Sequence, residues 1–170
     1  MVLKCSKIYI VLIISIFINI NSNNLLATEP PQELFVKDII KGSGRIVTEG
    51  KELAVHYEGW LYDKSLNIDK TEPCQAKGRP FDSSIKRGMP FSFIIGEGKV
   101  IKGWDKGLLG MYENGKRCLI IPPHLAYGKK AIPNVIPANS TLIFEVILLG
   151  FQSSSLILNS FEIHLAATKR

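Results

Sequence analysis

The sequence predicts an α+β fold, in which a mostly antiparallel sheet has one short helix laid across it. Two observations favour this class. Between residues 33 and 149, short apolar runs alternate with stretches rich in glycine and proline, as expected for strands joined by turns. One segment instead spaces its apolar residues by three and four, which is the period of a helix. With 170 residues, the chain is expected to form one domain.

Alternation of apolar residues assigns faces to the predicted strands. In the second run, Tyr57 faces inward and His56 faces outward, where it is expected to be exposed. In the last run, Phe144 faces inward, while Ile143 and Ile147 make the other side apolar as well. That strand is therefore expected to be central and covered on both faces. The runs are Glu33–Ile39, Leu53–Leu61, Phe91–Ile95, Arg117–Pro122 and Thr141–Leu149.

The helical segment carries Ile101, Trp104, Leu108 and Met111 on one face, which predicts a helix of about three turns. Three glycines lie inside it, and each costs about 1 kcal/mol relative to alanine. Packing against the sheet must therefore supply the stability that helix propensity does not.

Two regions predict less regular structure. Residues 62–80 are polar, contain two prolines and are expected to form an extended loop. Residues 151–170 follow the last strong strand, and their pattern fits a strand or a helix equally well. The folded domain is accordingly expected to span residues 28–150.

The N-terminus has the pattern of a secretory signal. Lys4 and Lys7 precede the apolar run Ile8–Ile18, and polar residues follow, so residues 1–27 are expected to be a signal and leader. An uncleaved anchor is the alternative, although the run is shorter than the roughly 20 apolar residues of a membrane span. Removing two lysines lowers the formal charge from +6 to +4. The remaining lysines are dispersed, which argues against a nucleic-acid partner.

Cysteine use is consistent with an oxidising route. Cys5 lies in the predicted signal, which leaves Cys74 and Cys118 as an even pair. They form either a disulfide, which would stabilise the fold by roughly 4 kcal/mol on the chain-entropy model, or two unpaired thiols. No Cys-x-x-Cys is present, so the sequence indicates no zinc site and no dithiol redox centre.

Motifs for covalent or metal-dependent catalysis are absent from the sequence. It contains no His-Glu-x-x-His, Gly-x-Ser-x-Gly, Gly-x-x-x-x-Gly-Lys or Gly-x-Gly-x-x-Gly. Aromatic residues instead gather at predicted inward positions, as a plain core or as the walls of an apolar site. They are Tyr57, Phe91, Phe93, Phe144 and Trp104, with Phe81 and Tyr127 in adjacent loops.

Five separated motifs resemble the FKBP-type peptidyl-prolyl cis-trans isomerases, especially the small members with secretory signals. They are VHYEGWL, FDSS, PFSFIIGEGKVIKGWDKGLLGM, KRCLIIPPHLAYG and IPANSTLIFEVILL, and the resemblance covers about residues 34–149. It implies a five- to six-stranded antiparallel half-barrel wrapped around one short helix. The two cysteines do not match the disulfide positions of secretory members.

The resemblance also implies a proline-binding pocket between helix and sheet. Trp104 would form its floor, and Tyr57, Phe91 and Phe144 its walls. Val100 and Ile101 would line the rim, with the Ile101 N–H donating to the ligand, and the Tyr127 hydroxyl would do the same. Phe81 and Asp82 would come from the FDSS motif, Arg87 would follow it at the matching offset, and Ile136 would close one edge. The 62–80 loop is longer than in small members and would reach over this pocket.

The implied function is catalysis of X-Pro bond rotation during folding of secretory-pathway proteins, without a metal or other cofactor. Partners would be proline-containing polypeptides and macrolides such as rapamycin, bound by a monomer in the endoplasmic reticulum lumen or after secretion. The alternatives are a non-catalytic module or chaperone that binds proline peptides, and a structural β-domain with a filled core.

Overall fold

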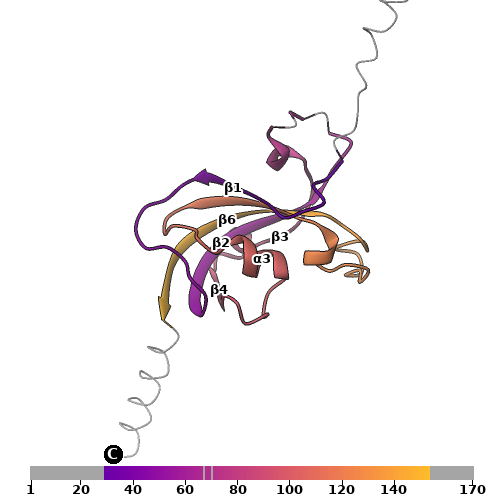
Figure 1. The fold of residues 1–170 in the computed structure, drawn as a ribbon. Coiled ribbons are helices and arrows are strands. Elements are labelled where there is room, and N and C mark those ends of the chain that lie inside the picture. The colour runs from indigo at the N-terminus through magenta and orange to yellow at the C-terminus, as the bar shows by residue number, and fades with distance from the viewer. Residues whose placement is uncertain (1–28, 67, 70, 154–170) are drawn as a thin grey trace, which may run out of the picture.

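The computed structural model describes residues 29–66, 68–69 and 71–153, and its six strands form one antiparallel sheet in the order β1-β5-β6-β2-β3, with β4 also paired to β2 (Figure 1). The sheet curves around α3, which confirms the predicted α+β half-barrel. The strands are β1 (Phe35–Ile40), β2 (Lys51–Tyr62), β3 (Lys77–Ser83), β4 (Phe91–Ile94), β5 (Lys116–Ile121) and β6 (Leu142–Ser153). The short helices are η1 (Pro73–Gln75), α2 (Ser84–Arg87), α3 (Lys102–Gly107) and η2 (Pro123–Leu125).

Strand β2 organises the sheet. It pairs with β6 from Lys51↔Ser153 to Leu61↔Leu142. Its other edge is shared, because β4 pairs with its first half and β3 with its second half. The short helix α2, which the sequence analysis missed, connects those two partners. Side chains at the end of β3, in α2 and at the start of β4 are thereby gathered along one edge of the sheet.

Alternation along the strands separates two cores on opposite faces. On the concave face, Leu119 and Ile121 of β5 join the large core that includes Trp104 of α3. On the back face, Cys118 and Ile120 of the same strand join a smaller core with Ile143 of β6. The prediction that β6 is central and covered on both faces is thus confirmed.

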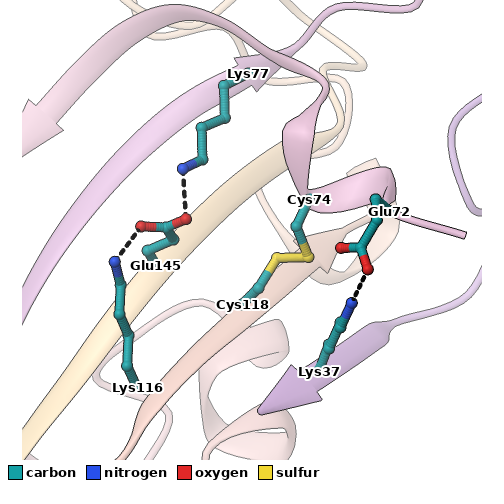
Figure 2. Close-up of a disulfide and its surroundings, with 7 residues drawn as sticks. All are labelled: Lys37, Glu72, Cys74, Lys77, Lys116, Cys118 and Glu145. Atoms are coloured by element: carbon teal, nitrogen blue, oxygen red, sulfur yellow. Dashed lines mark hydrogen bonds and ion pairs between the residues drawn. A yellow bond between two sulfur atoms is a disulfide. The ribbon is translucent and has the colours of Figure 1, made fainter. Parts of the chain in front are cut away.

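The segment that we call the back-face loop (residues 63–76) covers this smaller core. The disulfide Cys74–Cys118 attaches it to β5, with a sequence separation of 44, and Lys37 of β1 pairs with Glu72 at 2.5 Å (Figure 2). The expectation that residues 62–80 reach over the pocket is therefore wrong. The apolar residues around Cys74 are buried on the face of the sheet away from α3. The first residue of the expected loop belongs to β2, and its last residues belong to β3.

A second ion-pair cluster lies beside the disulfide. Glu145 of β6 accepts from Lys116 at 2.7 Å and also pairs with Lys77 (Figure 2). The Lys77 ammonium lies 4.4 Å from the centre of the Trp60 ring. The back face is therefore closed by a disulfide, apolar packing and paired charges.

Helix α3 has six residues rather than the predicted three turns. Leu108 ends it in a helical conformation, and Gly110 then turns the chain at φ 72°. Leu108 and Met111 are nevertheless buried, because the turn after the helix keeps their side chains on the core side. The periodicity identified the correct buried face but overestimated the regular helix.

Two predictions at the chain ends fall partly outside the description. The predicted signal, residues 1–27, lies outside the described residues, as do residues 154–170, whereas residues 151–153 continue β6. Among the described residues, no helix is long and apolar enough to span a membrane.

Candidate functional site

A cavity of about 730 Å³ opens between α3, the sheet and the η2 loop. This volume is in the range of small-molecule and peptide-anchor sites. Its aromatic lining comes from four strands, one helix and one loop, namely Tyr57, Phe81, Phe91, Phe144, Trp104 and Tyr127. The strand pattern is compatible with rings that fill the core or line a site, and in the structure these rings border the cavity.

The indole of Trp104 forms the floor. It is 4% exposed, and the rings of Tyr57, Phe91 and Phe144 stand on it at 85°, 73° and 85°. Their centroids lie 5.1–6.1 Å from the indole, which is the edge-to-face arrangement that aromatic pairs favour. Phe91 is 37% exposed although its strand position predicts burial, because its ring borders the cavity instead of closing it.

Small residues allow this packing. A Cβ on Gly103 would come within 2.4 Å of Ile121, and one on Gly107 within 2.7 Å of Leu119, so α3 lies directly on β5. A Cβ on Gly59 would come within 2.7 Å of Phe81 and 2.9 Å of Phe144. The expected packing of α3 against the sheet is confirmed. Because Gly59 has no side chain, the rings of Phe81 and Phe144 can occupy the space beside it.

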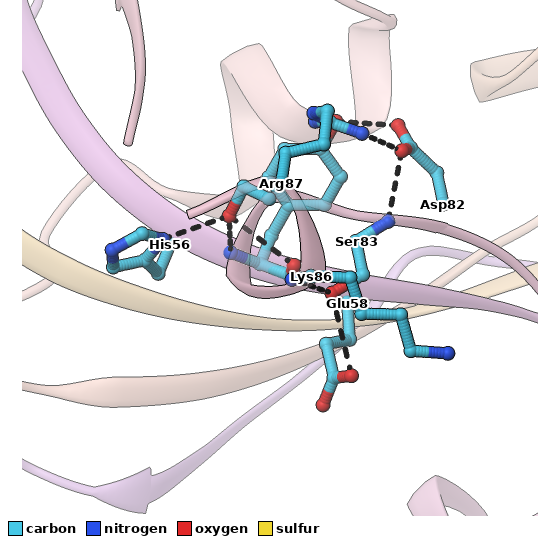
Figure 3. A network of polar contacts seen from close by, with 8 residues as sticks. His56, Glu58, Asp82, Ser83, Lys86 and Arg87 are labelled. Atoms are coloured by element: carbon cyan, nitrogen blue, oxygen red, sulfur yellow. Dashed lines mark hydrogen bonds and ion pairs between the residues drawn. The ribbon is translucent and has the colours of Figure 1, made fainter. Parts of the chain in front are cut away.

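A polar network borders one side of the cavity. The Tyr57 hydroxyl donates to Asp82 Oδ2 at 2.5 Å and accepts from Arg87 Nη2 at 2.8 Å, and Arg87 also pairs with Asp82 (Figure 3). Burial raises the pKa of Asp82. The hydrogen bonds from Tyr57 and Arg87 lower this pKa by more than burial raises it, so the net shift is downward. Burial and the bond to Asp82 raise the pKa of Tyr57. The carboxylate therefore stays ionised and the phenol protonated at neutral pH.

Ser84 holds this network against β2. Its buried Oγ accepts from the Tyr57 backbone N–H at 2.8 Å and lies 3.0 Å from His56 Nδ1 (Figure 3). His56 is consequently half-buried rather than exposed as predicted. The positioning role of Ser84 is not predicted from the sequence, although the FDSS motif contains this residue.

Several hydrogen-bond donors of the lining have no acceptor in the described part of the chain, among them the buried indole N–H of Trp104. Ile101 is the N-cap of α3, and its carbonyl accepts from Trp104 while its own N–H is unpaired. The Tyr127 hydroxyl also has no partner among these residues, and the side chain is 38% exposed. Both residues line the cavity, so both donors are available to a bound carbonyl.

Within residues 29–66, 68–69 and 71–153, no group of three His, Cys, Asp or Glu side chains is placed to hold a metal ion. The cavity offers apolar rings, unpaired donors, two lysine side chains and one paired carboxylate. Such a site can bind, orient and desolvate a ligand.

Comparison with known proteins identifies the architecture. The family model of FKBP-type peptidyl-prolyl cis-trans isomerases matches residues 43–149. The chain belongs to this family, whose members are peptidyl-prolyl cis-trans isomerases. It is 44% identical over 116 residues to an FK506-binding protein of Neisseria meningitidis, covering 68% of this chain and 94% of the relative. It is 47% identical over 113 residues to FK506-binding protein 1A of Neurospora crassa, covering 66% and 82%.

A solved structure supports the same assignment. The crystal structure of AtFKBP13 aligns with a TM-score of 0.58 and 35% sequence identity, covering 72% of this chain and 96% of that one. The six-stranded antiparallel sheet and short helices are thus those of an FKBP-type isomerase.

Two of the residues that the FKBP resemblance assigns to the pocket do not line it. Arg87 is exposed and reaches the cavity only through Tyr57 and Asp82. Ile136, expected to close one edge, is 2% exposed and packs in the concave core, where a bridge to Ile132 turns its side chain inward. Phe81, expected in a loop, belongs to β3. Val100 and Ile101 lie at the rim as expected.

Arg117, which the sequence does not single out, fixes α3 in this FKBP-type fold. Its side chain is buried, donates to the carbonyls of Gly107 and Leu109 at 2.9 and 3.0 Å, and pairs with Asp38 at 2.6 Å. Arginine near a helix C-terminus compensates carbonyls that lack helical partners. The signal in the sequence is an arginine at a strand position facing the helix.

Proposed function

We propose that this FKBP-type isomerase uses the aromatic cavity to accelerate rotation about X-Pro bonds, with the proline ring on Trp104. The observation that carries the proposal is an open aromatic cavity whose lining includes two unpaired donors, Ile101 N–H and Tyr127 O–H. A flat pyrrolidine ring matches the apolar floor. Flanking carbonyls of an extended peptide match the two donors.

The chemistry follows from the nature of the peptide bond. Planarity arises because the nitrogen lone pair delocalises into the carbonyl, and the barrier to rotation is about 18–20 kcal/mol. The planar state is more polar than the twisted state. An apolar enclosure therefore disfavours the ground state relative to the transition state, and donors placed for the twisted geometry lower the barrier further.

Each residue has a distinct part in this mechanism. Trp104 supports the ring, while Phe91 and Phe144 exclude water from the rotating amide. Ile101 and Tyr127 hold the peptide on either side of it. Asp82 and Arg87 fix the Tyr57 hydroxyl and thus the wall. No bond breaks, and each tenfold gain in rate requires about 1.4 kcal/mol of preferential transition-state binding.

The setting that we propose is the folding of proteins in the secretory pathway, in the endoplasmic reticulum lumen or after secretion. The support is the basic and apolar pattern of residues 1–27 together with a disulfide between Cys74 and Cys118. Disulfides persist in oxidising compartments and are rare in the cytosol. X-Pro rotation is slow enough to limit folding there. Macrolides such as rapamycin would compete for the same cavity.

A long loop over the pocket would favour a module that binds proline peptides without turning them over, but residues 63–76 lie on the back face. The loop therefore does not favour such a module.

A protease-coupled assay with a Leu-Pro peptide tests the proposal. We expect the cis-to-trans rate to rise in proportion to enzyme concentration and rapamycin to suppress the rise. Saturable peptide binding with an uncatalysed rate would instead support the binding module. Absence of both would leave a structural β-domain.

A further inference from the structure

Two lysines border the cavity on either side of Ile101. Lys99 and Lys102 both line it and both are exposed. Neither takes part in an ion pair with any residue that the structure describes. Their charges are therefore available to a ligand at the mouth.

Negative charge at the mouth does not offset them. The one carboxylate of the lining, Asp82, is already paired with Arg87. Glu97 lies two residues before Lys99 but neither lines the cavity nor pairs with it in the described chain. Lys129 and Lys130, which follow Tyr127 in the loop on the other side, are exposed and add positive charge.

The lysines are placed to meet residues next to the proline. Ile101 lies between Lys99 and Lys102 in the sequence. An extended peptide whose carbonyl binds the Ile101 N–H must therefore pass these two side chains. Extended chains advance about 3.3–3.6 Å per residue. Residues one or two positions from the proline therefore fall within the reach of a lysine side chain.

We propose that this cavity prefers proline segments with an aspartate or glutamate within two residues of the proline, and that Lys99 and Lys102 determine that preference. The proposal rests on the isomerase function proposed above and names its substrate class. The effect is moderate, because exposed charge pairs contribute little and salt screens them.

The test compares three acetyl-capped peptides that share Leu-Pro-Phe and carry glutamate, alanine or lysine before the leucine. Exchange NMR measures kcat/KM without a coupling protease. At low salt we expect glutamate to exceed alanine by about threefold and alanine to exceed lysine, with the differences lost in 1 M salt. The double variant Lys99→Glu/Lys102→Glu should reverse the order of the three peptides.

Lys106→Glu is the control, because it makes the same charge reversal as Lys99→Glu or Lys102→Glu alone, at an exposed position of α3 that does not line the cavity. It should keep the wild-type order. Equal rates for the three peptides, or a reversal by Lys106→Glu as well, would overturn the proposal while leaving isomerase activity intact. A wild-type enzyme that accelerates none of the peptides would instead refute the proposed function itself.

Discussion

The two faces of the sheet are built from the same strands, but one face borders an open cavity and the other is covered by a loop. On the concave face, aromatic rings stand around a cavity of about 730 Å³ and leave donors without partners. On the back face, the loop at Cys74 closes over a small core with a disulfide and paired charges (Figure 2). The comparison teaches that back-face residues of these strands serve stability alone, whereas concave-face residues both form the larger core and line the cavity. Substitutions on the two faces should therefore separate stability from activity.

The largest expected effect concerns the back face. Replacing Cys74 and Cys118 together by alanine should lower the free energy of unfolding by about 4 kcal/mol, because it removes a cross-link across 44 residues. Urea unfolding of the oxidised wild type and the double variant measures this. Activity of the folded variant should stay near wild type. A loss of kcat/KM with unchanged stability would contradict the division between the faces.

The two tryptophans offer a matched pair, one on each face. Trp104→Leu should lower kcat/KM for a Leu-Pro peptide by about tenfold, equal to about 1.4 kcal/mol, because the cavity loses its floor. Trp60→Leu removes the same ring from the back face, where it packs against the Cys74 core and Lys77. It should leave kcat/KM near wild type. Equal losses in both variants would mean that activity does not depend on this cavity.

The Glu145 cluster sharpens the comparison at a smaller scale. Glu145→Gln should lower the free energy of unfolding by about 1 kcal/mol, because Lys77 and Lys116 then share no carboxylate. Isomerase activity should not change. Thermal unfolding and the peptide assay together measure both effects, and the prediction is wrong if the variant loses activity without losing stability.

The smallest effect concerns acid stability on the concave side. Because the pKa of Asp82 is lowered in the fold, its ionisation stabilises the protein above the usual aspartate pKa near 3.9, and this contribution is lost as pH falls through the lowered value. The side chain is 38% exposed, so the contribution should not exceed about 1 kcal/mol.

Urea unfolding at pH 7 and below pH 3 measures this contribution. Asp82→Asn should be less stable than wild type at pH 7, and the gap should narrow in acid. Arg87→Met should reproduce the change, because it removes the cation that pairs with Asp82. A gap that widens at low pH would show that Asp82 is not stabilised in its ionised form.

Much of the fold could be predicted from the sequence because alternation and helical period report burial directly. Tyr57, Phe144 and Trp104 were assigned to the concave side on that basis alone, and the structure brings them together. Their role as cavity walls came from the family resemblance, since periodicity does not distinguish a filled core from an open one. Phe91 illustrates this, because an inward strand position predicts burial whether or not a cavity lies in front of it.

The remaining errors depend on contacts between distant segments. The direction of the 62–80 loop followed from the pairing of Cys74 with Cys118, which local pattern does not determine. The roles of Ser84 and Arg117 arise from hydrogen bonds to β2 and to the end of α3. Polar residues in short motifs carry no periodicity, so their partners become visible only in the folded chain.

The central claim is that the concave cavity itself accelerates X-Pro rotation. The most direct measurement is the cis-to-trans rate of a Leu-Pro peptide as rapamycin is added to the wild-type protein. We predict a catalysed rate that falls to the uncatalysed value once the cavity is saturated. Acceleration that persists at saturating rapamycin, or that never occurs without it, would contradict the account.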